Sequence, residues 1–227
     1  MPSTTTLPRL RQAVVAAAEL DPVVDRLQAE LGLGEPFSDP NVAFFGLRNA
    51  VFALGDSFLE VVSPVAPDTA AGRQIERQGG DCGYMLMFQI DDFEAARERA
   101  RESDVREVFE IAREDIDEVH LHPGDMRGAI VSLSRPQPPA TWPWGGPGWQ
   151  DRAAPARVRG ATIAVRDPDA VGQRWRSVVG ELPKLRFERE DSDRGLVEVV
   201  IATNTPRSDP VEIAGVRFRL VSNEEDR

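Results

Sequence analysis

The chain is short of the residues on which several kinds of chemistry depend. Its 227 residues include one cysteine, Cys82, one lysine, Lys184, and two histidines. A single cysteine excludes an internal disulfide and a zinc site of several cysteines. A single lysine limits Schiff-base chemistry to one position. The chain also has no run of 18 apolar residues and does not begin like a signal peptide, so we expect a cytoplasmic protein with no membrane partner.

Positive charge is also scarce. The chain has 38 acidic residues against 27 basic ones, which gives a net charge of −11. Nucleic acids and anionic membrane surfaces attract basic proteins, so neither is an expected partner. Glycine-rich stretches such as "WGGPG" are not flanked by a strand and a helix, as a phosphate-binding loop would be. The 41% hydrophobic content is enough for a packed core.

What the chain does have is a repeated pattern of one strand, one helix and three further strands. The first copy has a strand from residue 10, a helix that starts at Asp21-Pro22, and strands at 41–47, 49–55 and 57–64. The second has a strand at 83–90, a helix from Asp91 or Asp92, and strands at 105–111, 118–123 and 128–134. The third has a strand at 158–167, a helix from Asp167-Pro168, and strands at 184–190, 195–203 and 212–222. The pattern predicts an α+β fold of tandem βαβββ modules.

A segment rich in proline and tryptophan separates the second and third copies. It holds Trp142, Trp144 and Trp149, and it contains too much proline and glycine for a helix or a central strand. We therefore expect a two-module domain at 8–135, a linker at 136–157 and a third module at 158–222. The tryptophans would either cover a cavity or hold the third module against the other two.

The segments "QAVVAAAELDPVVDRLQAELGLG", "NAVFALGDSFLEVVSP" and "HLHPGDMRGAIVSLS" resemble the vicinal oxygen chelate superfamily, which includes glyoxalase I, methylmalonyl-CoA epimerase and extradiol dioxygenases. The resemblance implies that two paired modules form a curved sheet around a cavity that binds or transforms a small organic molecule. It leaves open a lyase, an isomerase, an oxidoreductase or a protein that only sequesters its ligand. An odd third module cannot close a two-module cavity by itself, so pairing with its copy in a homodimer is one hypothesis for its role.

The resemblance also implies four metal-ligand positions, at Gln12, Glu60, Tyr84 and Ser132. Gln12 and Glu60 match residue types that the superfamily uses there, whereas Tyr84 and Ser132 stand in place of a histidine and a glutamate. A catalytic divalent metal normally has three or four strong ligands. The expected metal site is therefore degenerate, and any divalent metal ion would depend on Gln12 and Glu60.

Glu60 and His120 are the candidate catalytic residues. Strand alternation places Glu60 on one face with Phe58 and Val62, and a carboxylate buried there would be a candidate base, whereas one at a sheet edge would simply face water. His120 and His122 alternate in "EVHLHPGDM", and histidine exchanges protons near neutral pH. His120 is expected to face the cavity or to be an ordinary wall residue. The expected pocket includes His122, which could instead support the turn at Pro123, and Asn49, which could instead serve turn geometry.

Overall fold

The computed structural model describes residues 7–182 and 184–223. Its strands are β1 (Arg9–Ala16), β2 (Leu47–Leu54), β3 (Ser57–Pro64), β4 (Cys82–Gln89), β5 (Glu107–Ala112), β6 (Ile116–Leu121), β7 (Ile130–Pro136), β8 (Ala156–Val165), β9 (Leu185–Arg189), β10 (Gly195–Thr203), β11 (Val211–Ile213) and β12 (Val216–Ser222). Its helices are α1 (Leu20–Leu31), η1 (Pro40–Phe45), α2 (Ala70–Gln78), α3 (Phe93–Glu102), α4 (Pro123–Met126), η2 (Pro143–Gly145), α5 (Trp149–Arg152) and α6 (Pro168–Val179). Within the described ranges, no helix has both the length and the apolar character needed to cross a membrane.

The first two modules form one seven-stranded sheet, in the order β2-β3-β1-β4-β7-β6-β5. The central strands β1 and β4 are antiparallel, and each has a parallel neighbour, β3 beside β1 and β7 beside β4. Alternation gives the sheet two different faces. Val15, Leu59 and Leu86 belong to the main core, whereas Val14, Phe58 and Met87 belong to a second apolar cluster on the other face. That second face carries the candidate site.

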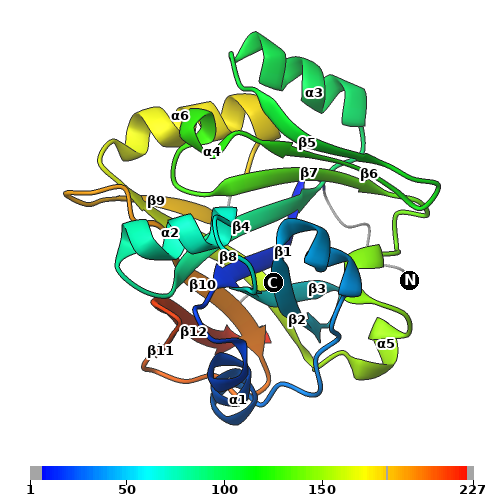
Figure 1. The fold of residues 1–227 in the computed structure, drawn as a ribbon, viewed down its shortest axis with the longest axis vertical. Coiled ribbons are helices and arrows are strands. Elements are labelled where there is room, and N and C mark those ends of the chain that lie inside the picture. The colour runs from blue at the N-terminus through cyan, green and yellow to red at the C-terminus, as the bar shows by residue number, and fades with distance from the viewer. Residues whose placement is uncertain (1–6, 183, 224–227) are drawn as a thin grey trace.

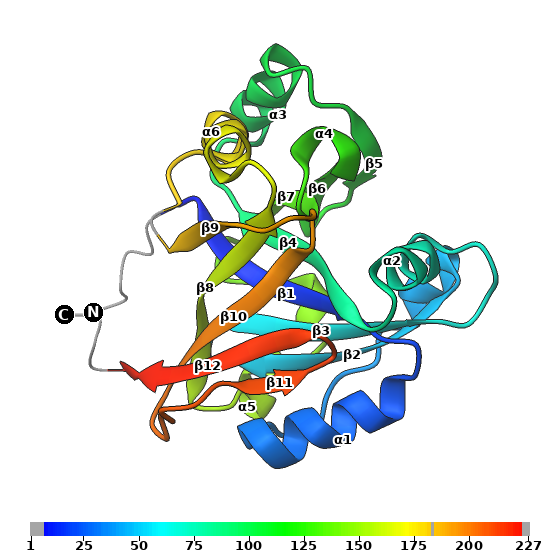
Figure 2. The same ribbon diagram turned by 90° about the vertical axis from the view of Figure 1, so that its left-hand side faces the viewer.

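The C-terminal strands form a second sheet, in the order β11-β12-β10-β8-β9. It packs against the first sheet, and Figure 2 shows β8 and β10 in front of β1 and β4. Ile163, Val199 and Phe218 of this sheet join the main core with Val15 and Leu86. Helices α3 and α6 lie side by side at one end of the interface (Figures 1 and 2). The two sheets are therefore layers around one shared core, and the α+β class is confirmed.

The first module differs from the prediction at residues 41–47: most of this segment belongs to the 3-10 helix η1, and only Leu47 lies in a strand, β2. Pro40 occupies its first turn, and the Asp39 side chain accepts a hydrogen bond from the Asn41 N–H. Gly46 ends it in the left-handed conformation. Phe37 pairs with Val51 at the sheet edge in a single bridge. The apolar "VAFF" segment suggested a strand, but the capping residues on either side favour a helical turn.

Other differences are local. Helix α1 begins at Leu20, so Asp21 lies in its first turn and is not the cap, whereas Asp92 and Asp167 cap α3 and α6 as predicted. Helix α2, capped by Thr69, was not predicted. The last predicted strand is a hairpin, β11 and β12, which turns at Ala214 with a positive φ. The C-terminal strands also pair in an order unlike that of β4 to β7, because β8 lies between β9 and β10.

The close approach of the two sheets gives a test of their packing. A Cβ atom added to Gly83 on β4 would lie 2.1 Å from the Leu196 carbonyl oxygen on β10, so Gly83→Ala forces the backbones apart. Overpacking of this kind costs about 2 kcal/mol of unfolding free energy. Urea denaturation should show a lower midpoint for Gly83→Ala. The control is Gly34→Ala, whose nearest new contact would be 3.8 Å away. Equal midpoints for the two variants would contradict this packing.

Candidate functional site

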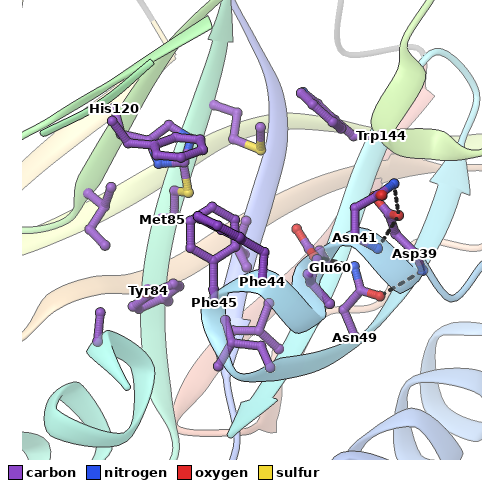
Figure 3. Close-up of a pocket in the computed structure, with 18 of the residues that line it drawn as sticks. Asp39, Asn41, Phe44, Phe45, Asn49, Glu60, Tyr84, Met85, His120 and Trp144 are labelled. Atoms are coloured by element: carbon purple, nitrogen blue, oxygen red, sulfur yellow. Dashed lines mark hydrogen bonds between the residues drawn. The ribbon is translucent and has the colours of Figure 1, made fainter. Parts of the chain in front are cut away.

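A cavity of about 520 Å³ lies on the free face of the seven-stranded sheet. Figure 3 shows that its residues come from both modules: Glu60 and Asn49 lie on one side, and His120, Met85 and Tyr84 lie on the other. Its remaining walls are largely apolar, with aromatic and aliphatic side chains from η1, β2, β4, β5 and β7: Val42, Phe44, Phe45, Leu47, Met87, Phe109, Ile111 and Ile130. Such a lining suits an organic molecule with few polar groups.

Glu60 is a buried polar residue of the cavity wall and is 8% exposed. Its Oε2 accepts a hydrogen bond from Gln12 Nε2, and its Oε1 accepts one from Asn49 Nδ2, both at 2.7 Å. Both amides are oriented by groups that can only donate. The Trp142 indole N–H donates to Gln12 Oε1 at 2.7 Å, and the Asp39 backbone N–H donates to Asn49 Oδ1 at 2.9 Å. Each amide therefore turns its NH₂ group toward Glu60.

This environment shifts the proton affinity of Glu60 toward neutral pH. Burial raises the pKa of Glu60 to about 7, and the two amide donors oppose that shift in part. A carboxyl group with such a pKa can both take and release a proton at neutral pH. Burial also raises the pKa of Tyr84 to about 12, and the Glu60 charge adds to this effect, so the phenol stays neutral beside it.

The opposite wall holds a second carboxylate, Glu118, paired with His120. His120 Nε2 lies 2.7 Å from Glu118 Oε1, and the imidazole lines the cavity while the carboxylate is 2% exposed. Ser134 Oγ and the Trp144 indole N–H donate to Glu118 Oε2 at 2.6 and 2.9 Å. Glu118 therefore fixes the orientation of the imidazole, and His120 is the group of this pair that a ligand can reach most directly.

The tryptophan segment packs on the same face of the sheet as the cavity. Trp142 is buried against Phe58, with ring centroids 6.1 Å apart, and Trp149 contacts the edge of Phe58. Arg11 lies 5.1 Å from the Trp142 ring and also hydrogen-bonds to Gln89. Burial lowers the pKa of Arg11 to about 9. Trp144 forms part of the cavity wall, which is one of the two roles expected from the sequence, whereas Trp142 and Trp149 pack on Phe58 of the first module.

Aromatic rings surround another part of the cavity. Phe44 and Phe45 of η1 approach Phe109 of β5, with centroids 6.3 and 5.0 Å from its ring, and the centroid of Phe109 is 5.0 Å from that of His120. Phe44 is 81% exposed although it lines the cavity. The segment that was expected to be a strand thus joins the two modules across the cavity (Figure 3).

The structure brings together five of the seven predicted site residues: Gln12, Asn49, Glu60, Tyr84 and His120 all line the cavity. Ser132 does not line it; it is fully buried and its hydroxyl lies 2.9 Å from that of Ser134. His122 also lies elsewhere, beyond the end of β6. There its ring caps α4 and lies 3.0 Å from Arg106. Pro123 starts a helical turn, so strand alternation does not continue from His120 to His122.

Sequence reasoning missed Glu118, although it stands two residues before His120. The same alternation that directs His120 to the cavity directs Glu118 there, so the signal was present. The parts played by Asp39 and Trp144 are harder to anticipate. Asp39 acts through its backbone N–H, and Trp144 reaches Glu118 from 26 residues further along the chain.

The donor set does not fit a divalent metal ion. Gln12 Oε1 accepts from Trp142, so the group that Gln12 presents near Glu60 is an NH₂, which cannot ligate a metal. Tyr84 lies at an irregularity of the β1–β4 pairing, and its neighbour Met85 takes the paired position opposite Val14. Thioethers and neutral hydroxyls are poor ligands for hard cations. In the described residues, no cluster of three or more His, Cys, Asp or Glu side chains could hold a metal ion.

A sheet of two modules around one cavity is the architecture that the resemblance to the vicinal oxygen chelate superfamily implied. More specifically, the chain belongs to the glyoxalase-like domain family, whose model matches residues 13–179. No curated protein gives a significant match.

Solved structures support the fold. A variant of methylmalonyl-CoA epimerase from Streptomyces coelicolor, in complex with 2-nitronate-propionyl-CoA, is 24% identical, covers 58% of this chain and 99% of its own, and has a TM-score of 0.50. Methylmalonyl-CoA epimerase from Mycobacterium tuberculosis is 21% identical, covers 60% and 93%, and has a TM-score of 0.50. A hypothetical protein from Bacillus halodurans is 16% identical, covers 57% and 95%, and also has a TM-score of 0.50. At these identities the likeness concerns the fold.

The raised pKa of Glu60 predicts a pH-dependent cost to stability. Folding raises the pKa of this carboxyl from 4.5 to about 7, so the folded state favours its protonated form. The resulting contribution to stability is complete below pH 4.5 and is lost as the pH rises through 7. Glu60→Gln stays neutral, so its stability relative to the unmodified protein should improve between pH 5 and pH 8, by at most about 3 kcal/mol. Urea denaturation at both pH values measures this difference. Glu102→Gln, at an exposed helix position, is the control. A Glu60→Gln difference that is the same at both pH values would refute a raised pKa.

Proposed function

We propose that the protein binds a small, mainly apolar organic molecule in the cavity of the seven-stranded sheet and moves a proton on it without a metal ion. Glu60 is the proposed base, and His120, oriented by Glu118, is the proposed proton donor or acceptor on the other wall. The observation that carries this proposal is Glu60 itself: a buried carboxyl group that lines an apolar cavity and has a pKa of about 7.

The arrangement suits a carbon acid. A C–H bond next to a carbonyl group needs a base to take its proton and a donor to stabilise the oxygen that becomes negative. The neutral Tyr84 hydroxyl and His120 are the candidate donors to that oxygen. The Streptomyces coelicolor epimerase structure was solved with 2-nitronate-propionyl-CoA, and another similar epimerase structure was solved with methylmalonyl-CoA. The acyl part of such a compound is one candidate for the apolar cavity. The candidate reaction is therefore a metal-independent isomerisation or elimination.

The experiment is proton exchange in D₂O. Small α-branched ketones and thioesters that raise the melting temperature of the protein are incubated with it, and ¹H NMR follows the loss of the α-proton signal. General-base catalysis contributes about 10²–10⁴-fold, so Glu60→Gln should slow exchange by at least about 100-fold. Glu102→Gln should leave the rate unchanged. Undiminished exchange in Glu60→Gln would contradict the assignment of the base.

The alternative function is ligand sequestration without turnover. It is favoured by the apolar lining and by the amides that hold both oxygens of Glu60. In that case the bound ketones and thioesters would keep their α-protons, and Glu60→Gln would change affinity only. A bulky residue at Leu47, as in Leu47→Trp, should abolish binding under either proposal because Leu47 lines the cavity. Retained binding in that variant would place the ligand elsewhere.

A further inference from the structure

The C-terminal sheet repeats the centre of the first sheet residue by residue. In the first sheet β1 and β4 are antiparallel, with Gln12 opposite Met87; in the second, β10 and β8 are antiparallel, with Glu198 opposite Thr162. Both pairs have register shifts at the same two places, between Leu10/Gln12 and Val14/Val15 in one sheet and between Leu196/Glu198 and Val200/Ile201 in the other. Glu198 is therefore the counterpart of Gln12.

The strand beside β1 in the first sheet, β3, also has a counterpart in the second sheet, the strand β12 beside β10. β3 lies parallel to β1 with Glu60 opposite Val14, and β12 lies parallel to β10 with Arg219 opposite Val200. The counterpart of Glu60 is thus Arg219. The Gln12–Glu60 hydrogen bond also has a counterpart, because Arg219 Nη2 donates to Glu198 Oε1.

The strand beside β4 in the first sheet, β7, likewise has a counterpart in the second sheet, the strand β9 beside β8. β7 lies parallel to β4 with Ser132 opposite Met87, and β9 lies parallel to β8 with Arg186 opposite Thr162. Helices α3 and α6 follow the corresponding strands β4 and β8. Each helix follows an aspartate whose side chain accepts a hydrogen bond from the backbone N–H three residues later in the chain. The second sheet therefore corresponds to a shortened two-module sheet. Its strands that match the second module, β8 and β9, come before those that match the first module, β10 and β12, along the chain.

The counterpart of the first site coincides with two adjoining hollows of about 310 and 400 Å³, which share Thr162, Arg186 and Arg219. Alternation turns these residues away from the shared core, so the two sites lie on opposite sides of the two layers. Where the first site presents a carboxyl group, the second presents guanidinium groups. This is unexpected in a chain whose net charge is −11.

The guanidinium groups are only partly neutralised by described residues. Glu198 is 5% exposed and holds Arg219 through its Nη2 atom; Thr162 Oγ1 also donates to Glu198, at 3.2 Å. The other two nitrogens of Arg219 have no acceptor within the described ranges. Arg217 pairs with Glu188 at 3.3 Å and lies 3.7 Å from Glu198. Arg186 is exposed and makes no ion pair with any residue that the structure describes.

We propose that this face of the second sheet is a binding site for a small organic anion, recognised through a carboxylate or phosphate group by Arg186 and Arg219. Planar guanidinium groups bind both anions through paired hydrogen bonds. Glu198 positions Arg219 and does not contact the ligand. The site is separate from the Glu60 cavity and takes a ligand of opposite chemistry.

The test uses inorganic phosphate and succinate as probes. Each is titrated into ¹⁵N-labelled full-length protein at constant ionic strength, with ¹H–¹⁵N spectra as the readout. Both should shift signals of β8, β9, β10 and β12, and the stronger binder identifies the preferred headgroup. Loss of a charge-assisted hydrogen bond predicts that Arg186→Gln weakens binding about tenfold or more. Arg176→Gln, an equal charge change at an exposed position of α6, should leave binding unchanged.

Three outcomes would overturn the proposal. The first is the absence of shifts in these strands at tens of millimolar of either probe. The second is an equal effect of Arg186→Gln and Arg176→Gln, which would reduce the interaction to general charge. The third is a dimer that Arg186→Glu converts to a monomer in light scattering, which would assign this face to a second copy of the chain.

Discussion

The candidate site depends on a constraint that lies outside the cavity: an indole N–H can donate a hydrogen bond but cannot accept one. Trp142 donates to Gln12, which leaves the Gln12 amide only one way to face Glu60. The Asp39 backbone N–H imposes the same condition on Asn49. As a result a buried carboxyl group receives one donor on each oxygen. Without those donors its burial would carry an uncompensated cost.

The same constraint explains why a glyoxalase-like sheet can lose its metal and keep a polar centre. A metal ligand at Gln12 would need its oxygen, and that oxygen is already engaged by the tryptophan segment. Burial, opposed in part by the two amide hydrogen bonds, places Glu60 between ionised and neutral, which a bound cation would not do, since a nearby positive charge lowers a carboxyl pKa. The tryptophan segment is thus part of the candidate site through Trp142 and Trp144, and it also packs on the sheet.

Sequence alone predicted the face on which Glu60 lies, because period-2 alternation with Phe58 and Val62 is a local property. It also predicted a helix cap at Asp167 and another at Asp91 or Asp92, of which Asp92 is the cap, since capping depends on neighbouring residues. It could not predict that Trp142 binds Gln12, 130 residues earlier, because no local pattern records that contact. It was wrong for η1, where apolar composition outweighed the proline and glycine at its ends. Strand order in the second sheet was equally inaccessible, since alternation identifies a strand but not its neighbours.

The pairing registers also bear on how such a fold changes its chemistry. A β-bulge moves every later side chain, so two sheets with shifts at the same places keep the same positions on the same face. Between the two sheets of this protein, those positions exchange an amide for a carboxylate and a carboxylate for a guanidinium. A hydrogen-bonded pair is kept each time, because a lone charge at a nearly buried position would be costly. The backbone therefore fixes where a hydrogen-bonded polar pair lies in each sheet, and the residue types at those positions decide whether the pair includes a guanidinium group.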